Sequence, residues 1–142
     1  MMGELRQITP DQMAKLKDKA VIESIMASDG LGLDKLWNAL HHVLGGGGGQ
    51  SAAFDGKALY HYDTGYGPPM YLTPSEVATY AQELASMTEE QIRSRFDLDD
   101  MEDDDVYVIP DDPEELVELL GELRAFYQDA AGKGHGMLIY LT

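Results

Sequence analysis

The stretch that decides the fold is Leu72-Thr73-Pro74-Ser75-Glu76-Val77, in which a short apolar run leads into a helix start. The threonine hydroxyl can accept a hydrogen bond from the Glu76 amide while the Glu76 side chain reaches back to the threonine amide, which is a capping box. Pro74 stands at the first helical position, where no amide hydrogen is needed. Apolar residues then recur at helical spacing as far as Leu84. The stretch predicts a strand followed directly by an amphipathic helix.

Two other segments carry the same start signal, one at Thr9 and one at Thr88. Each threonine is followed three residues later by glutamine, and apolar residues stand where a hydrophobic staple requires them. The similarity extends over about six residues, whereas an internal repeat would persist over about 20 or more, so capping alone explains it. We expect Thr9, Thr73 and Thr88 each to be an N-cap, and the helix after Thr9 to end at Ser28-Asp29-Gly30.

The apolar pattern predicts the remaining helices and strands. A long helix should begin at Asp112-Pro113 and end at Gly132 or Gly134, and another should occupy Leu33–Leu44. The pentaglycine Gly45–Gly49 is too flexible for the interior of an element and should be a loop. Shorter apolar runs predict strands at Leu5–Ile8, Ala58–Tyr62, Met70–Leu72, Val106–Ile109 and Met137–Leu141. Because these elements lack βαβ spacing, we expect a single α+β domain over residues 1–142, with a small, mostly antiparallel or mixed sheet packed with about five to six helices.

Charge limits the possible partners. The chain has 142 residues with 26 acidic and 10 basic side chains, which gives a net charge of −16. Half of the acidic residues lie between Asp97 and Glu122, where there is no lysine or arginine. Such a protein repels nucleic acid and anionic membranes, so we expect neither as a partner. The run Asp99–Asp105 lacks the glycine and glutamate of an EF-hand loop, and we expect it to be a poorly ordered surface loop.

Other features indicate the compartment. No apolar run approaches the roughly 18 residues that suggest a membrane span, and residues 1–20 contain no apolar signal-peptide core. The chain has no cysteine, which excludes disulfides, thiolate metal sites and cysteine nucleophiles and fits a reducing compartment. We therefore expect a cytoplasmic protein.

The segment Leu33–Leu44 contains the most informative side chains. On a helix, Asp34 and His41 would lie two turns apart at one border of an apolar stripe, with Trp37 between them. A partly buried histidine at such a border is suited to acid–base or ligand-binding work. The simpler alternative is that Trp37 belongs to the core and His41 hydrogen-bonds a neighbouring carbonyl. His42 would point the other way and should be exposed.

A second polar and aromatic group lies in the loop Gly65–Tyr71. Glycine permits close backbone approach and proline fixes the path of the chain, so we expect this loop to cover Trp37 and to share one shallow cleft with His41. The candidate ligand-binding residues are Asp34, Trp37, His41, Tyr66 and Tyr71. The sequence lacks the patterns typical of a metal site, a nucleotide loop or a catalytic triad, so we expect no metal, no cofactor and no catalytic residues.

Three ordered motifs carry a resemblance to a known family. They are Leu33-Asp34-Lys35-Leu36-Trp37-Asn38-Ala39-Leu40-His41, then Gly65-Tyr66-Gly67-Pro68 followed by Tyr71-Leu72-Thr73-Pro74-Ser75-Glu76-Val77, and Leu123-Arg124-Ala125-Phe126-Tyr127 with Met137-Leu138-Ile139-Tyr140. Across nearly its whole length the chain resembles the YfbM-like family of bacterial proteins, a domain of unknown function. It departs from that family at Leu5-Arg6-Gln7, where an aromatic residue is usual, and at the pentaglycine. The resemblance implies a single α+β domain of the bacterial cytoplasm and no particular activity.

Two interpretations of function stay open. In the first, the protein is a non-enzymatic protein- or ligand-binding domain, for example an immunity- or inhibitor-like protein that meets a basic partner through complementary charge. In the second, it is a small-molecule-binding protein or hydrolase in which Asp34 orients His41 as a base. We favour binding because the sequence offers no complete set of catalytic partners. Acidity that only improves solubility is the alternative to a charged partner site.

Overall fold

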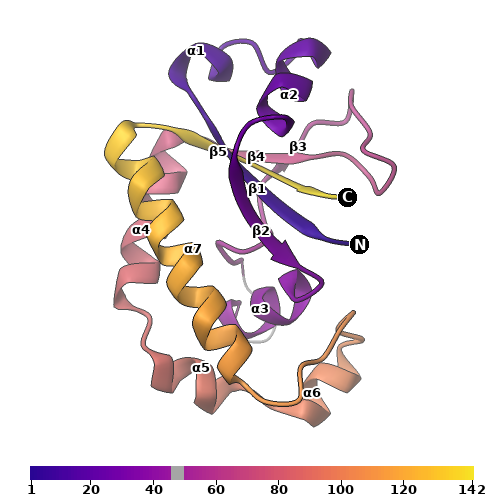
Figure 1. Cartoon of the computed structure of the whole chain (residues 1–142), viewed down its shortest axis with the longest axis vertical. Helices are drawn as coiled ribbons and strands as arrows, with labels where there is room; N and C mark the ends of the chain where they lie inside the picture. The colour runs from indigo at the N-terminus through magenta and orange to yellow at the C-terminus, as the bar shows by residue number, and fades with distance from the viewer. Residues whose placement is uncertain (46–49) are drawn as a thin grey trace.

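The computed structural model describes residues 1–45 and 50–142, which form a single α+β domain built on one sheet (Figure 1). The pentaglycine loop expected at Gly45–Gly49 lies outside the described residues except for Gly45, which caps a helix. The strands are β1 (Gly3–Ile8), β2 (Gly30–Asp34), β3 (Lys57–Ala58), β4 (Met70–Leu72) and β5 (Gly136–Leu141). The helices are α1 (Pro10–Met13), α2 (Lys19–Met26), α3 (Trp37–Leu44), α4 (Pro74–Ser86), α5 (Glu89–Arg95), α6 (Leu98–Asp103) and α7 (Glu114–Lys133).

The five strands form an antiparallel sheet in the order β2-β1-β5-β4-β3. Side chains of β5 alternate between two apolar clusters: Met137 and Ile139 belong to one, and Leu138 and Tyr140 to the other. Because successive strand residues point to opposite faces, each cluster covers one face of the sheet. Helix α2 packs on the face of Leu138, and the long helices α4 and α7 pack on the other face (Figure 1).

The expected helix starts at the three threonines are confirmed. Thr9, Thr73 and Thr88 each form a capping box, in which the hydroxyl accepts from the N3 amide and the N3 side chain accepts from the threonine amide. The long C-terminal helix also ends where expected, because Gly134 adopts a left-handed conformation with φ 69° that terminates α7. The start of this helix, one residue after Pro113, agrees equally well with the sequence.

The expected helix Leu33–Leu44 is wrong over its first turn. Helix α3 begins at Trp37, and Leu33 and Asp34 instead end β2, an edge strand that pairs with β1 and that the sequence did not predict. Asp34 has φ 52°, which no α-helix accommodates. Leu33 fitted a helical stripe because it faces the same apolar core as the helix that follows, so tertiary pairing overrides the local pattern.

Four other expectations need correction. The helix after Thr9 is divided into α1 and α2, because the side chain of Asp18 caps a new helix. The strand expected at Ala58–Tyr62 shortens to β3, and Val106–Ile109 forms no strand, since the Tyr107 amide donates to the Asn38 side chain and not to a neighbouring strand. The acidic run expected as a loop is mostly helix α6, since the Asp97 side chain accepts from the amides of Asp99 and Asp100 and starts a helical turn.

Candidate functional site

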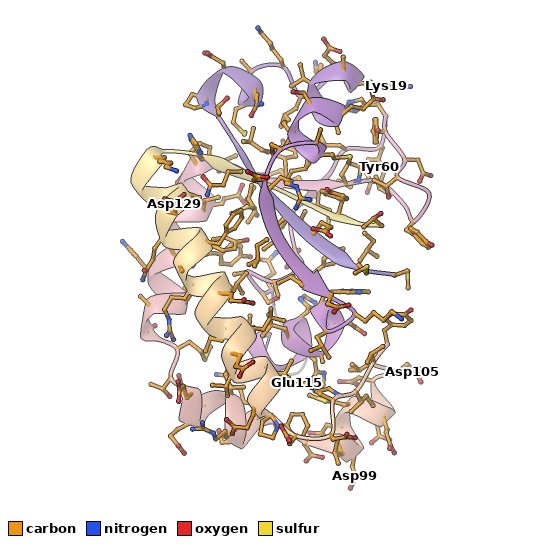
Figure 2. All side chains as sticks on the ribbon, in the orientation of Figure 1. Lys19, Tyr60, Asp99, Asp105, Glu115 and Asp129 are labelled. Carbon is orange, nitrogen blue, oxygen red and sulfur yellow. The ribbon has the colours of Figure 1, made fainter. Side chains whose placement is uncertain are left out.

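A groove between the edge strand β2 and the helix α7 is the candidate site. Its volume is about 700 Å³, and it lies where the end of β2 approaches the N-terminal half of α7, close to the labelled Glu115 in Figure 2. Strand β2 and the turn after it contribute Gly32, Leu33, Asp34 and Leu36, and α7 contributes Glu115, Glu118, Leu119 and Glu122. The groove therefore has an apolar floor of leucines and a rim of four carboxylates.

Helix α7 places three of these carboxylates by its periodicity alone. Glu115, Glu118 and Glu122 follow the spacing i, i+3, i+7, which puts them on one side of the helix. The opposite side of α7 is buried against the sheet and α4, so the helix cannot rotate to hide the glutamates. Because Leu119 is buried beside them, their charged ends stand around an apolar patch.

Strand β2 places the fourth carboxylate through an irregularity in its pairing with β1. The register shifts between Gly3 and Glu4, so that Gly3 pairs with Asp34 while Glu4 pairs with Gly32. Such a bulge bends the strand and redirects the side chain that follows it. Asp34 adopts φ 52°, its Oδ1 accepts a hydrogen bond from the Lys35 amide at 2.7 Å, and the residue is exposed at the groove.

The four groove carboxylates carry no compensating cation in the described part of the chain. None of them takes part in an ion pair within residues 1–45 and 50–142, and no lysine or arginine lines the groove. They also do not converge: within the same residues no group of three or more histidine or acidic side chains is placed to hold a metal ion. The site is a spread of separate negative charges.

Trp37 lies outside this groove, in an aromatic group at the start of α3. Its ring is tilted against Phe54, with ring centroids 4.7 Å apart, and against Tyr107 at 6.4 Å. A Cβ at Gly3 would lie 2.5 Å from the Trp37 Cβ, so only glycine lets β1 pass over the indole. Trp37 Nε1 is buried and has no hydrogen-bond partner among the described residues. Trp37 is thus covered by these groups, and ligand binding there stays a prediction.

His41 forms a hydrogen bond that ties α3 to the segment after the pentaglycine. Its Nδ1 lies 2.5 Å from the Oγ of Ser51, and Ser51 is only 3% exposed. Burial lowers the pKa of His41, opposed in part by the nearby Asp55 carboxylate. The expectation that His42 is exposed is wrong: its side chain is 11% exposed, and its Nδ1 lies 3.2 Å from Oδ2 of Asp104, the residue that caps the C-terminal end of α6.

Tyr66 and Tyr71 of the Gly65–Tyr71 segment have surroundings that differ from those of Trp37. Tyr71 packs with the cluster on the α2 face of the sheet, whereas Trp37 packs with the cluster on the α7 face. Tyr66 is 55% exposed, and its loop is held by the Asp63 carboxylate, which accepts from two loop amides. The sheet therefore separates Tyr71 from Trp37, whereas Met70 of the same segment packs with the Trp37 cluster, and the shared cleft with His41 stays a prediction. Ligand binding by Tyr66 or Tyr71 remains a prediction.

Of the expected site residues only Asp34 lines the groove. Sequence reasoning missed Glu115, Glu118 and Glu122, which were treated as part of a charge block. The available signal was their spacing along one side of a helix within a stretch that has no lysine or arginine. No local pattern shows that this side of the helix meets Asp34, because their proximity depends on the position of β2 at the sheet edge.

The architecture belongs to the α+β class, with helices on both faces of one antiparallel sheet. A family model described as "Domain of unknown function (DUF1877)" matches residues 1–140, and the chain belongs to this family. The chain is also similar to the crystal structure of a protein of unknown function, YfbM from Escherichia coli. That match has a TM-score of 0.78 at 18% sequence identity and covers 98% of each chain, so it shows the fold.

The comparisons assign no activity. No curated protein matches the chain. Among the described residues, no helix combines the length and the apolar character needed to cross a membrane.

Proposed function

We propose that the protein is a non-enzymatic binding domain whose groove between β2 and α7 takes a basic segment of a partner protein. The observation that carries this proposal is the set of carboxylates at Asp34, Glu115, Glu118 and Glu122, which form no ion pair among the described residues and surround an apolar floor. Surface carboxylates held without a cation repel one another, so a lysine- or arginine-bearing partner relieves that repulsion on binding.

The distribution of charge supports a basic partner. Figure 2 places Asp99, Asp105 and Glu115 at one end of the molecule and Lys19 at the other. With a net charge of −16 in the whole chain, the acidic end attracts a cationic surface over several ångströms and favours rapid encounter. An immunity- or inhibitor-like role toward a basic protein is one form that such binding takes. The same field disfavours nucleic acid and anionic membranes as partners.

The spread of the carboxylates supports a polypeptide over a single cation. A metal ion requires ligands that meet at one point, whereas these side chains come from two elements and do not converge in the described residues. Several lysine or arginine side chains on one segment meet separate carboxylates, and the leucine floor accepts the aliphatic stems of those same side chains.

The hydrolase alternative has less support. His41 and Ser51 are in contact, but Ser51 is buried and its Oγ also accepts a bond from the Ala53 amide at 3.3 Å. A nucleophile must be reachable by its substrate, so this pair is better explained as a tie between α3 and the next segment.

The proposal is tested with a short acetylated peptide in which lysine and valine alternate. Binding to the whole chain is measured by fluorescence anisotropy at about 50 mM and about 500 mM salt, because screening weakens contacts between charges. We expect the triple variant Glu115→Gln/Glu118→Gln/Glu122→Gln to bind at least about tenfold more weakly than the original protein at low salt.

The matched control removes the same charge far from the groove. The variant Asp11→Asn/Glu23→Gln/Glu83→Gln changes three exposed side chains that do not line it and that lie on α1, α2 and α4. A loss of peptide binding in the groove variant, without a loss in the control variant, supports the groove as the binding site. Equal losses in both triple variants would instead mean that the peptide responds to net charge alone, and the proposed site would be rejected.

A further inference from the structure

We infer that the basic segment binds as an added β-strand on the free edge of β2, with its cationic side chains at alternate positions. This inference rests on the proposed function and adds its binding mode. Strand addition uses main-chain hydrogen bonds for affinity and alternate side chains for specificity, so it predicts the spacing of lysine or arginine in the partner.

The register of the sheet shows which backbone groups of β2 are free. Met2 and Thr142 exchange both backbone hydrogen bonds, at 2.8 and 3.0 Å, which makes them a hydrogen-bonded pair of the β1–β5 ladder. In an antiparallel ladder such pairs alternate, so Leu5 directs its N–H and C=O to the opposite side, toward Leu31 of β2. The neighbouring Gly32 therefore turns its N–H and C=O outward, away from β1.

The two edges of the sheet differ in how they are protected. The β3 edge has only two residues and includes Lys57, and short edges and lysines both discourage strand pairing. The β2 edge has five residues, Gly-Leu-Gly-Leu-Asp, without lysine or proline, and it pairs only with β1 in the part of the chain the structure describes. Its outer edge is open for an incoming strand, and the groove is directly beside it.

The position of α7 explains why the incoming strand is basic at every second residue. Leu31 and Leu33 of β2 point to the cluster on the α7 face. A strand added beside β2 has alternate side chains on that same face, where Glu118 and Glu122 line the groove. Lysine or arginine at those positions meets the carboxylates, and the intervening side chains point away from α7.

Charge argues against a second copy of this chain as the occupant. Pairing two β2 edges would bring together two molecules that each carry −16, and would place the Asp34 and α7 carboxylates of both copies side by side. Like charges in such an interface oppose association. The occupant is a strand from a basic partner.

The test removes the backbone N–H of Gly32, which points away from β1. Gly32→Pro removes an N–H that points away from β1, and proline is tolerated at such edge positions. Gly32→Ala adds a Cβ, whose nearest neighbour is the Glu4 carboxylate at 3.6 Å, and keeps the amide. With the lysine–valine peptide as probe, we expect the proline variant to bind at least about tenfold more weakly than the alanine variant.

Hydrogen exchange on the unaltered protein gives a second measurement that does not depend on a variant folding. Saturation with the peptide should slow exchange of the Gly32 amide, while the Leu31 amide, already directed toward β1, should change little. Equal binding by the two Gly32 variants, or no added protection at Gly32, would overturn strand addition. If the groove charge variant still weakens binding in that case, the proposed function stands and only this binding mode fails.

Discussion

Two neighbouring glutamates at the start of α7 have opposite surroundings. Glu114 is held by Arg93, whose Nε lies 2.9 Å from Glu114 Oε1 and whose other nitrogens reach Glu89 and Glu90 of its own helix. Glu115, the next residue, lines the groove and takes part in no ion pair among the residues described. Arg93 lowers the pKa of Glu114 through their hydrogen bond.

This difference separates charge that serves the fold from charge that is available for binding. The Arg93 cluster, defined as Arg93 with Glu89, Glu90 and Glu114, links α5 to α7 and contributes to the packing of two helices. The groove carboxylates form no ion pair that joins one helix or strand to another among the described residues. Arg93 neutralises Glu114, whereas the adjacent Glu115 has no cationic partner among the described residues. This contrast leads to four predictions.

The largest effect is expected at the groove floor. Leu33 is fully buried, so Leu33→Ala should lower the free energy of unfolding by about 2–5 kcal/mol through lost apolar burial and a new cavity. Urea denaturation measures this loss. The control Leu98→Ala removes an exposed leucine of α6 and should have little effect. A negligible loss of stability in Leu33→Ala, like that expected for Leu98→Ala, would contradict the prediction.

The cap of α5 positions the Arg93 cluster and should have the next largest effect. Thr88→Ala removes the oxygen that accepts from the Gln91 amide, so the free energy of unfolding should fall by about 1 kcal/mol. Thr88→Ser keeps a hydroxyl and should retain most of that stability. Thermal denaturation of both variants checks the prediction, which fails if serine is as damaging as alanine.

Removing the guanidinium of Arg93 should have a smaller effect on stability, and this effect should depend on pH. Arg93→Met should be less stable than the original protein at neutral pH, because Glu114 loses its partner. The folded pKa of Glu114 lies below its ordinary value of 4.5, so its contribution is complete above that value and is lost as pH falls through the folded pKa.

Thermal melts from neutral pH to about pH 3 measure this dependence. The stability difference between Arg93→Met and the original protein should shrink at the acidic end of that range. A difference that stays constant with pH would mean that Arg93 acts through packing of its aliphatic stem.

The smallest effect is expected from the groove charges. Glu118→Gln with Glu122→Gln removes no ion pair of the described residues, so the free energy of unfolding should change by no more than about 0.5 kcal/mol. Any change at low salt should be a gain, because repulsion within the acidic helix is relieved. Urea denaturation at two salt concentrations measures it, and a clear loss of stability would show that these carboxylates serve the fold.

The parts of the fold that depend on local chemistry were predictable. A capping box is complete within four residues, and Gly134 ends α7 by its own backbone preference, so both are visible in the sequence. Strand β2 was not predictable in this way. Its pairing with β1 is a contact between distant segments, and Leu33 fits the apolar stripe of a helix equally well.

The candidate site was predictable only in fragments. Asp34 is a candidate residue in the sequence analysis, where it is expected on a helix. In the structure it is the last residue of β2 and has a left-handed backbone conformation. The glutamates of α7 were visible as charge, yet their relation to Asp34 requires knowing that β2 is an edge strand. The sequence indicates an aromatic residue at a helix border at Trp37, but spacing does not reveal its packing against Phe54 and Tyr107.

The position of β5 in the sheet has a consequence for the order of events during protein synthesis. β5 is the central strand and also the last of the five in the chain, and it alone joins the β2–β1 pair to the β4–β3 pair. While a ribosome makes the chain, the two pairs therefore stay unconnected until the residues of β5 have emerged. Helix α7 is made just before β5 and can already pack on the earlier helix α4, but the native sheet forms only after β5 has been made, through long-range contacts that are slow to form.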